Sequence, residues 1–176
     1  MPVSAPQYEE IWAPEVRDFV YISDKAYTRE QILAMEKLML NTLKFSLTLP
    51  TPYNFQARFL KAANMQADKQ VTMLSGYLLE LSLVDSGMLK HSYTIVAAAA
   101  AFVAMEAFGR ADSFPKAMAR HAGYTKEAIL PCAAALVALM KKAPTATLTA
   151  VHKKYSHVKF MEIAKTEVPS IDEADF

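Results

Sequence analysis

The sequence predicts an all-α protein with a globular core. Four glycines and nine prolines in 176 residues, with alanine and leucine abundant, leave few of the turn and β-branched signals that accompany strands. Hydrophobic residues make up 53% and charged residues 21% of the chain, which is typical of a globular protein. The octet from Ala26 to Leu33 returns in nearly the same form 97 residues later, from Gly123 to Leu130. We therefore expect two helical repeats in tandem.

The first repeat is expected to contribute two helices. A short helix is predicted over residues 14–21, because its opening proline suits the first position of a helix. A longer helix is predicted over residues 28–45, because Thr28 and Gln31 have the spacing of a capping box. A proline-rich break at residues 50–52 then closes the repeat.

The second repeat is expected to contain five helices, followed by a further short one. The five are predicted over residues 51–63, 68–84, 92–108, 114–121 and 125–142, and the short one over residues 149–155. The segment from Ala97 to Ala101 lies in a helix that is apolar on all sides, so we place this helix at the centre of the bundle. Gly76 is expected to allow the close approach of another backbone. Pro131 is expected to kink the last main helix.

The net charge, the single cysteine and the apolar segments indicate which classes of partner and which compartment are expected. The formal net charge of +1 gives no broad field to attract a phosphate backbone, so we expect no nucleic-acid partner. The one cysteine, Cys132, lies in an apolar helical run and is expected to be a small buried hydrophobe in a reducing compartment. No secretory signal is expected, because the first residues show no basic segment followed by an apolar one. The longest apolar stretch, residues 93–105, is too short for a membrane span. We expect no membrane partner.

No pattern in the sequence predicts catalysis, a cofactor or a metal site. The four glycines are isolated, so no phosphate-cradling loop is expected. His152 and His157 are five residues apart, which is not the spacing of zinc-protease histidines, and the lysines beside them favour a solvated surface. Serine, histidine and aspartate occur without the spacing of a nucleophile elbow. We therefore expect a protein that is not an enzyme, with no cofactor.

One charged residue stands within an apolar arc. On a helical wheel, the helix over residues 28–45 places a continuous set of apolar side chains on one face: Ile32, Leu33, Met35, Met39, Leu40 and Leu43. Glu36 falls near the middle of this face. A carboxylate in that position is either desolvated and paired, or reaches solvent from a half-covered face. The pattern alone leaves both alternatives open.

The residues around the first octet are similar to those of a known family. Residues 8–24, the octet and residues 35–45 resemble the end of the first cyclin box of a mitotic, B-type cyclin of plant type, and the similarity continues through residues 51–53, 76–85 and 123–132. The resemblance implies a cyclin-type helical bundle with one complete five-helix repeat and the last two helices of a preceding repeat. The domains expected are a truncated first cyclin box over residues 1–49, a second cyclin box over residues 50–156 and a C-terminal tail over residues 157–176.

The expected truncation follows from the positions of the two octets. The first octet begins only 25 residues after Met1, whereas the second lies about 72 residues past the proline-rich break. About 47 residues of the first repeat are therefore expected to be missing. We expect the second repeat to fold independently and residues 1–49 to be marginally stable alone. The apolar face of the helix over residues 28–45 is expected to be uncovered and available to a partner or to self-association.

The family resemblance implies a regulatory function and a set of contact residues. It implies a regulatory subunit of a cyclin-dependent protein kinase in mitotic (G2/M) control of cell division, located in the nucleus and cytoplasm. The glutamate matching Glu36 pairs in cyclins with a lysine, which falls at Gln7 in this chain, and the two grip the C-helix region of the kinase. The kinase interface implied in this way is Glu36, Gln7, Tyr8, Ile11, Leu40, Phe45 and Leu47.

Two function classes are left open by these residues. The apolar members of the implied interface would equally serve as ordinary core residues. Because Gln7 supplies a hydrogen bond but no charge, the contact is expected to be weaker than in a lysine-bearing cyclin. The alternative function is therefore a truncated cyclin-fold scaffold that binds no kinase, or an isoform that acts as a competitor. A stronger kinase interaction after Gln7→Lys would favour the first class.

Overall fold

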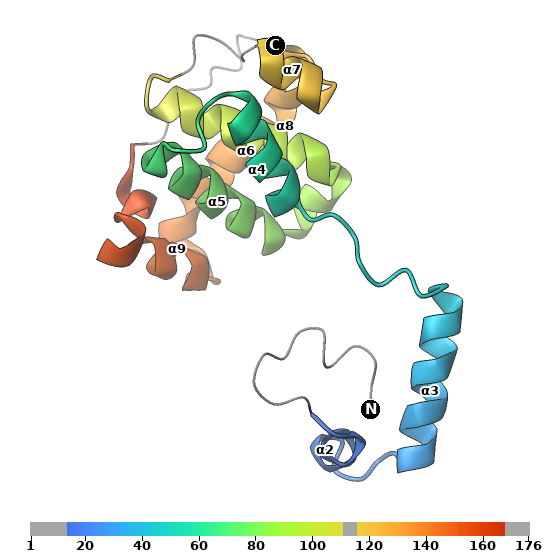
Figure 1. The fold of residues 1–176 in the computed structure, drawn as a ribbon. Helices are drawn as coiled ribbons and strands as arrows, with labels where there is room; N and C mark the ends of the chain where they lie inside the picture. Colours follow the sequence, from blue (N-terminus) through green and yellow to red (C-terminus); the bar gives the residue numbers. More distant parts are fainter. Residues whose placement is uncertain (1–13, 111–115, 168–176) are drawn as a thin grey trace. The chain divides into compact units, whose positions relative to one another are not determined.

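The computed structural model describes residues 14–110 and 116–167 and divides the chain into two compact units, residues 1–49 and residues 50–176 (Figure 1). The described residues form helices, turns and connecting segments, with no strand among them. The prediction of an all-α fold is confirmed.

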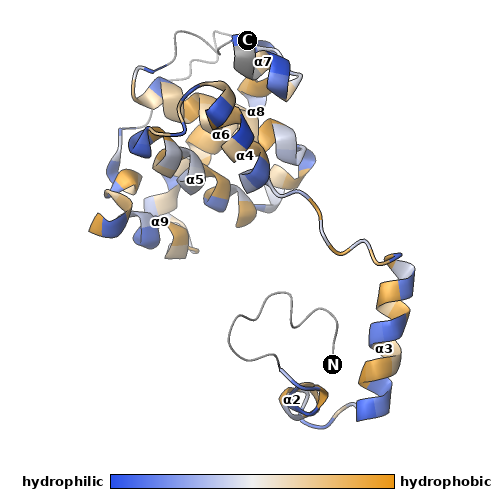
Figure 2. Cartoon of the chain, viewed as in Figure 1, coloured by the Kyte–Doolittle hydropathy of each residue, from blue (hydrophilic) through white to orange (hydrophobic). Residues whose placement is uncertain are grey.

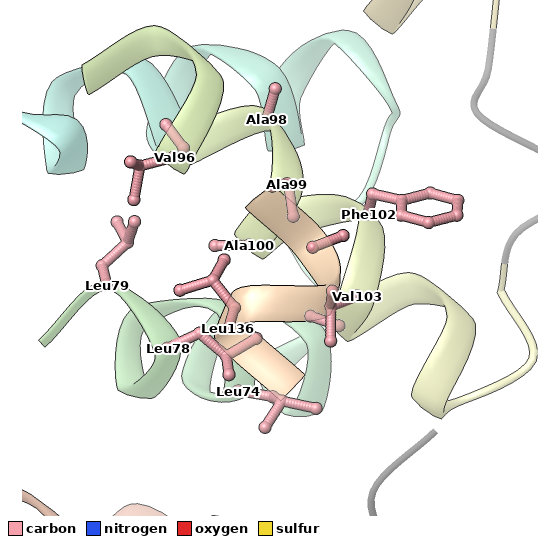
Figure 3. Packing of buried hydrophobic residues seen from close by; sticks show 14 of the residues in the cluster. Leu74, Leu78, Leu79, Val96, Ala98, Ala99, Ala100, Phe102, Val103 and Leu136 are labelled. Atoms are coloured by element: carbon pink, nitrogen blue, oxygen red, sulfur yellow. The ribbon is translucent and has the colours of Figure 1, made fainter. Parts of the chain in front are cut away.

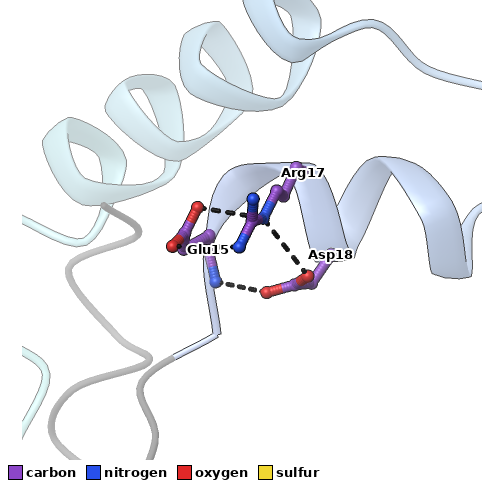
Figure 4. A network of polar contacts seen from close by, with 3 residues as sticks. All are labelled: Glu15, Arg17 and Asp18. Atoms are coloured by element: carbon purple, nitrogen blue, oxygen red, sulfur yellow. Dashed lines mark hydrogen bonds and ion pairs between the residues drawn. The ribbon is translucent and has the colours of Figure 1, made fainter.

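Helix α2, Val16–Ile22, opens the described part of the first unit. Its N-terminus is fixed by a capping box, in which the backbone N–H of Glu15 donates to Oδ2 of Asp18 at 2.6 Å. Arg17 lies beside both carboxylates, with its Nε 3.1 Å from Oε2 of Glu15 (Figure 4). The helix therefore begins two residues later than predicted, because Glu15 takes the capping position. Val16 is its one buried residue.

Helix α3, Arg29–Thr42, begins as the sequence predicts. The backbone N–H of Gln31 donates to Oγ1 of Thr28 at 3.3 Å, and the N–H of Thr28 donates to Oε1 of Gln31 at 2.8 Å. The predicted capping box is confirmed.

The end of α3 differs from the prediction, which ran to Phe45. Lys44 and Phe45 have positive φ angles of 50° and 58°, which is the left-handed conformation of a helix terminus. The N–H of Phe45 donates to the carbonyl of Leu40 at 2.9 Å and closes the last turn. Because neither residue is a glycine, the sequence carries no ordinary signal for this stop.

The second unit contains most of the helices. They are α4, Pro52–Ala62; α5, Lys69–Leu83; η1, Ser86–Lys90; α6, Tyr93–Ala107; α7, Lys116–Ala122; α8, Lys126–Lys142; η2, Ala143–Thr145; α9, Ala150–Tyr155; η3, Val158–Phe160; and η4, Ile163–Lys165. Asp68, Ser92 and Thr125 accept backbone N–H groups at the starts of α5, α6 and α8. The predicted start at residue 114 lies outside the described residues.

Helix α6 lies at the centre of the second unit, as predicted. It packs against α4, α5 and α8, and Ala97 to Ala101 are fully buried. Figure 3 shows Ala100 of α6 beside Leu78 of α5 and Leu136 of α8. Alanines allow the neighbouring helices to approach closely, so one helix that is apolar on all sides can form a shared core.

Gly76 of α5 is approached by side chains. A Cβ at this position would lie 3.4 Å from the hydroxyl of Tyr155 and 3.9 Å from Nε2 of Gln56. The predicted close approach of another backbone is therefore wrong, since the groups beside Gly76 belong to side chains of α9 and α4.

The packed unit extends past residue 156, where the sequence predicted a tail. Ile163 is buried, and η4 packs against α5 and α9. Met161 and Glu162 have φ angles of 58° and 52°, so the chain turns sharply just before Ile163. The acidic end of the predicted tail, residues 168–176, lies outside the described residues.

Cys132 is buried in α8, as predicted. Burial raises the pKa of its thiol to about 12. The segment Lys126–Thr145 is long and apolar enough to cross a membrane by length and composition alone. However, Ile129, Leu136 and Met140 are buried within the unit, and a core helix of a globular protein passes the same test.

Candidate functional site

The first unit carries an apolar groove along α3. Its volume is about 780 Å³, and twelve residues of the connected α2 and α3 segments line it: Phe19, Tyr27, Gln31, Ile32, Ala34, Met35, Glu36, Leu38, Met39, Leu40, Leu43 and Leu47. Figure 2 shows hydrophobic residues in orange at successive turns of α3, with hydrophilic residues in blue between them. A concave, largely apolar surface of this size is typical of binding sites.

The side chains of this groove are unusually exposed for apolar residues. Met35, Met39 and Leu43 succeed one another at four-residue spacing and are 55%, 56% and 49% exposed. No residue of α3 is buried. Methionine is flexible and polarisable, so two methionines on one face suit a surface that adapts to a partner. An exposed apolar face of this kind is a candidate site of protein interaction.

Glu36 lies within the groove and is half-buried. This position answers the question left open by the helical wheel, because the carboxylate is neither removed from water nor fully exposed. It introduces one negative charge into a lining that is otherwise apolar apart from Gln31. A partner at this groove would therefore meet apolar side chains together with one carboxylate.

The structure brings three of the predicted interface residues together. Glu36, Leu40 and Leu47 line the groove, and the two leucines are half-buried. Phe45 is largely exposed, at 64%, and does not line the groove. The other three predicted residues, Gln7, Tyr8 and Ile11, lie outside the described residues. The role of all seven as an interface stays a prediction.

The prediction of the interface omitted nine residues that line the groove, among them Phe19, Tyr27, Met35, Met39 and Leu43. The last three belong to the apolar arc that the helical wheel identified, so the signal for them was present. Phe19 and Tyr27 lie in a short amphipathic segment beside α3. This position is the sequence signal for their part in the groove, and by itself it does not identify a partner.

A polar cluster joins α5 to α9 in the second unit. The hydroxyl of Tyr155 donates to Oε1 of Glu80 at 2.8 Å, and Lys154 Nζ lies 2.6 Å from the same oxygen. The hydroxyl of Tyr77 lies 3.0 Å from Nδ1 of His152. Burial raises the pKa of Tyr77 to about 12, and burial followed by the bond to Glu80 raises the pKa of Tyr155. The cluster anchors α9 and supplies no activated nucleophile.

The residues in ranges 14–110 and 116–167 hold no group of three or more histidine, cysteine, aspartate or glutamate side chains that could bind a metal ion. The groove on α3 is lined by apolar side chains, one amide and one carboxylate.

Comparison with known proteins agrees with this helical architecture. The family model of the cyclin C-terminal domain matches residues 50–169, and that of the cyclin N-terminal domain matches residues 3–48. The chain belongs to the cyclin family. Cyclin-B2-1 of Oryza sativa subsp. japonica is 50% identical over 163 residues, which cover 93% of this chain and 38% of that cyclin.

Other curated relatives are likewise named as plant cyclins. Cyclin-B2-4 of Arabidopsis thaliana is 47% identical over 93% of this chain and 37% of its own length. G2/mitotic-specific cyclin-1 of Medicago sativa subsp. varia is 44% identical over 94% of this chain and 38% of its own length. The resemblance to plant B-type mitotic cyclins is confirmed, and the chain spans about 38% of the length of these relatives.

Proposed function

We propose that the chain acts as a regulatory subunit of a cyclin-dependent protein kinase in mitotic (G2/M) control, and that the groove on α3 packs against the C-helix region of the kinase. The observation that supports this proposal is the exposed apolar face of α3 in a chain whose relatives are named mitotic cyclins. The groove offers the apolar area that a kinase helix would need to be held in place.

The mechanism of such a subunit is positional. A protein kinase is active when the glutamate of its C-helix forms an ion pair with the lysine that binds the ATP phosphates. A protein that holds this helix inward favours the active state through its own contact free energy. In this proposal the chain contributes Met35, Met39, Leu40 and Leu43 as contact area and contributes no catalytic group, so it is not an enzyme.

Glu36 gives the proposed interface its polar anchor. Its carboxylate lies among apolar side chains of the groove and would accept hydrogen bonds from the kinase or from Gln7. Gln7 supplies an amide donor but no charge. Charge-assisted hydrogen bonds are about twice as strong as neutral ones, so Gln7→Lys should strengthen the contact.

A second candidate function is a cyclin-fold scaffold or competitor that does not activate a kinase. The presence of glutamine at position 7, where the family resemblance implies lysine, favours this reading. A related possibility is self-association of two chains through the groove on α3, since an uncovered apolar face also suits a second copy.

The proposed setting is the nucleus and cytoplasm, with no nucleic acid and no membrane as direct partner. The net charge of +1 supports the first exclusion, because nucleic-acid binding requires a basic surface. The burial of the apolar residues of α8 within the second unit supports the second.

Titration calorimetry of the purified chain against an unphosphorylated mitotic cyclin-dependent kinase tests the proposal. We expect a Kd of about 1 μM, which corresponds to about −8 kcal/mol. Met39→Asp should weaken binding at least about tenfold, because it places a charge in the apolar groove. Leu89→Asp is the matched control. Leu89 is exposed, belongs to the second unit and does not line the groove.

Three outcomes separate the candidate functions. Binding that Met39→Asp weakens and Leu89→Asp leaves unchanged supports the kinase-binding role. Absence of binding heat at two temperatures favours the scaffold. A concentration-dependent increase in sedimentation coefficient that Met39→Asp abolishes would instead identify self-association through the same face.

A further inference from the structure

A second hollow lies at the C-terminal ends of α5 and α8. Its volume is about 200 Å³, and it is lined by residues at and just after the ends of α5 and α8 and by the segment that follows: Leu81, Val84, Asp85, Leu139, Lys142, Ala143, Ala146, Thr147 and Leu148. All of them belong to the second unit, so this hollow is separate from the groove on α3.

The walls of this hollow are apolar and partly exposed. Leu81 and Ala143, which line it, are buried, whereas Val84 is 44% and Leu148 is 61% exposed. Covering the exposed part of Leu148 with another apolar group would be favourable by about 25 cal/mol for each Å² removed from water. A hollow of about 200 Å³ has room for a single large side chain.

The charges at the hollow are not paired with each other. Oδ1 of Asp85 accepts the backbone N–H of Gly87 at 2.7 Å, so this carboxylate is engaged in capping η1. Lys142 is exposed in the last turn of α8, and the described part of the chain places no carboxylate within ion-pair distance of its ammonium group. The neighbouring Lys141 is exposed in the same way. The hollow therefore presents an apolar cavity beside a cation available to an acidic group.

We propose that this hollow is a docking site for a short protein segment that presents a leucine- or phenylalanine-sized side chain with an aspartate or glutamate one helical turn away. The apolar side chain enters between Val84 and Leu148, and the carboxylate pairs with Lys142. A helical turn separates positions i and i+4 by about 6 Å, which matches the reach of a lysine beside an apolar pocket. The proposal does not depend on kinase binding by α3.

A membrane surface is the less suitable occupant. Lysines beside exposed leucines also suit an anionic bilayer, but lipid binding favours a convex or flat apolar face that can enter the interface. The apolar residues here line a concavity, and Ala143 among them is buried. A protruding side chain fills such a concavity, whereas a bilayer surface covers only its rim.

Selection from a random-peptide display library on the full chain tests the proposal. We expect enriched peptides that carry leucine or phenylalanine with aspartate or glutamate three or four positions away. Their binding should fall at least tenfold on Leu148→Asp and severalfold on Lys142→Glu. Leu89→Asp and Lys90→Glu are the matched controls, because both residues are exposed in the same unit and do not line the hollow. Methyl NMR of the complex should perturb Val84, Leu139 and Leu148.

Each other outcome contradicts the proposal. Enrichment that survives Leu148→Asp would place the binding elsewhere, and the absence of enrichment over the Leu148→Asp chain would mean that the hollow binds no such segment. Sedimentation with phosphatidylserine vesicles that Leu148→Asp and Lys142→Glu abolish would assign the surface to a membrane. The thermal melting of Leu148→Asp should match that of the unmodified chain, since the replaced side chain is exposed.

Discussion

Helices α3 and α8 begin with nearly the same octet and carry apolar residues in the same register, yet their surroundings differ. Met35, Met39 and Leu43 of α3 correspond, 97 residues later, to Cys132, Leu136 and Met140 of α8. The three residues of α8 are at most 3% exposed, whereas those of α3 are about half exposed. A helix's own pattern therefore shows which face is apolar, and its neighbours decide whether that face is core or binding surface.

Glu36 shows how the two helices differ in chemistry. It corresponds to Ala133, which is fully buried among α8's neighbours. A carboxylate could not occupy Ala133's place without losing its hydration, but it is tolerated at position 36, where the side chain is half-buried. The arc of α3 is thus compatible with a partner that offers a polar group, whereas the arc of α8 is compatible only with a closed apolar core.

The largest expected effect on the free energy of unfolding comes from placing a glutamate at position 133, which is compared with placing an alanine at position 36. Ala133→Glu should destabilise the second unit by several kcal/mol or prevent its folding, because it overpacks the core and buries a charge. Glu36→Ala should change the free energy of unfolding by no more than about 0.5 kcal/mol. Urea denaturation followed by circular dichroism measures both. If Ala133→Glu lowered the free energy of unfolding as little as Glu36→Ala does, the proposed difference between the two helices would be contradicted.

Thiol labelling compares the two faces directly at positions 35 and 132. Burial raises the pKa of Cys132 from 9.0 to about 12, so at pH 8 the reactive thiolate is about a thousandfold rarer than for an ordinary thiol. Met35→Cys, placed in a Cys132→Ala chain, should react about a thousandfold faster with a disulfide reagent than Cys132 does in the unmodified chain. Equal rates would mean that Cys132 is not held in a closed core.

The same pKa shift predicts a loss of stability in alkali. A raised pKa means that the folded state holds its proton more tightly than the unfolded chain does. The stabilisation is therefore complete below the unfolded value of about 9 and declines as the pH rises toward about 12. Tyr77 acts in the same direction between about 10 and about 12. Stability that is unchanged between pH 9 and 11 would contradict this burial.

Truncation of corresponding side chains should give a smaller contrast. Leu136→Ala should cost about 2–5 kcal/mol, because it leaves a cavity in the core around α6. Met39→Ala should cost less than about 1 kcal/mol, because its side chain is 56% exposed. Denaturant midpoints with an unchanged slope provide the measurement. Similar costs for the two variants would show that α3 is packed as tightly as α8.

The smallest contrast is expected at the shared caps. Thr28 and Thr125 each accept a backbone N–H three residues later, at 3.3 Å and 3.4 Å. Replacing either by alanine should cost about 1 kcal/mol of helix stability. Thr125→Ala should lower the global denaturation midpoint, whereas Thr28→Ala should increase the exchange of α3 amides alone. A global effect of Thr28→Ala would show that α3 unfolds together with the second unit.

Much of the fold could be predicted because its signals are local. Thr28, Asp68, Ser92 and Thr125 cap helices where the sequence places them, and the alanine run lies in the central helix. Each of these features depends on residues within one or two turns. Local chemistry of this kind is visible in a single sequence.

The features that escaped prediction depend on distant contacts or on unusual backbone. Lys44 and Phe45 end α3 in a left-handed conformation that non-glycine residues rarely signal. Tyr155 beside Gly76 and the buried Ile163 reflect packing between segments far apart in the chain. Similarly, the helical wheel identified the apolar arc around Glu36, but the contribution of Phe19 and Tyr27 to the groove depends on how α2 folds back on α3.

Native-state hydrogen exchange of the full chain tests the difference between α3 and α8 most directly. The amides of α8 should exchange only through opening of the second unit, at a free energy close to that of global unfolding. The amides of α3 should exchange through local opening at a lower free energy, because its apolar face is exposed and none of its residues is buried. Equal protection of the two helices would contradict this account and would show that α3 belongs to a core as closed as that of α8.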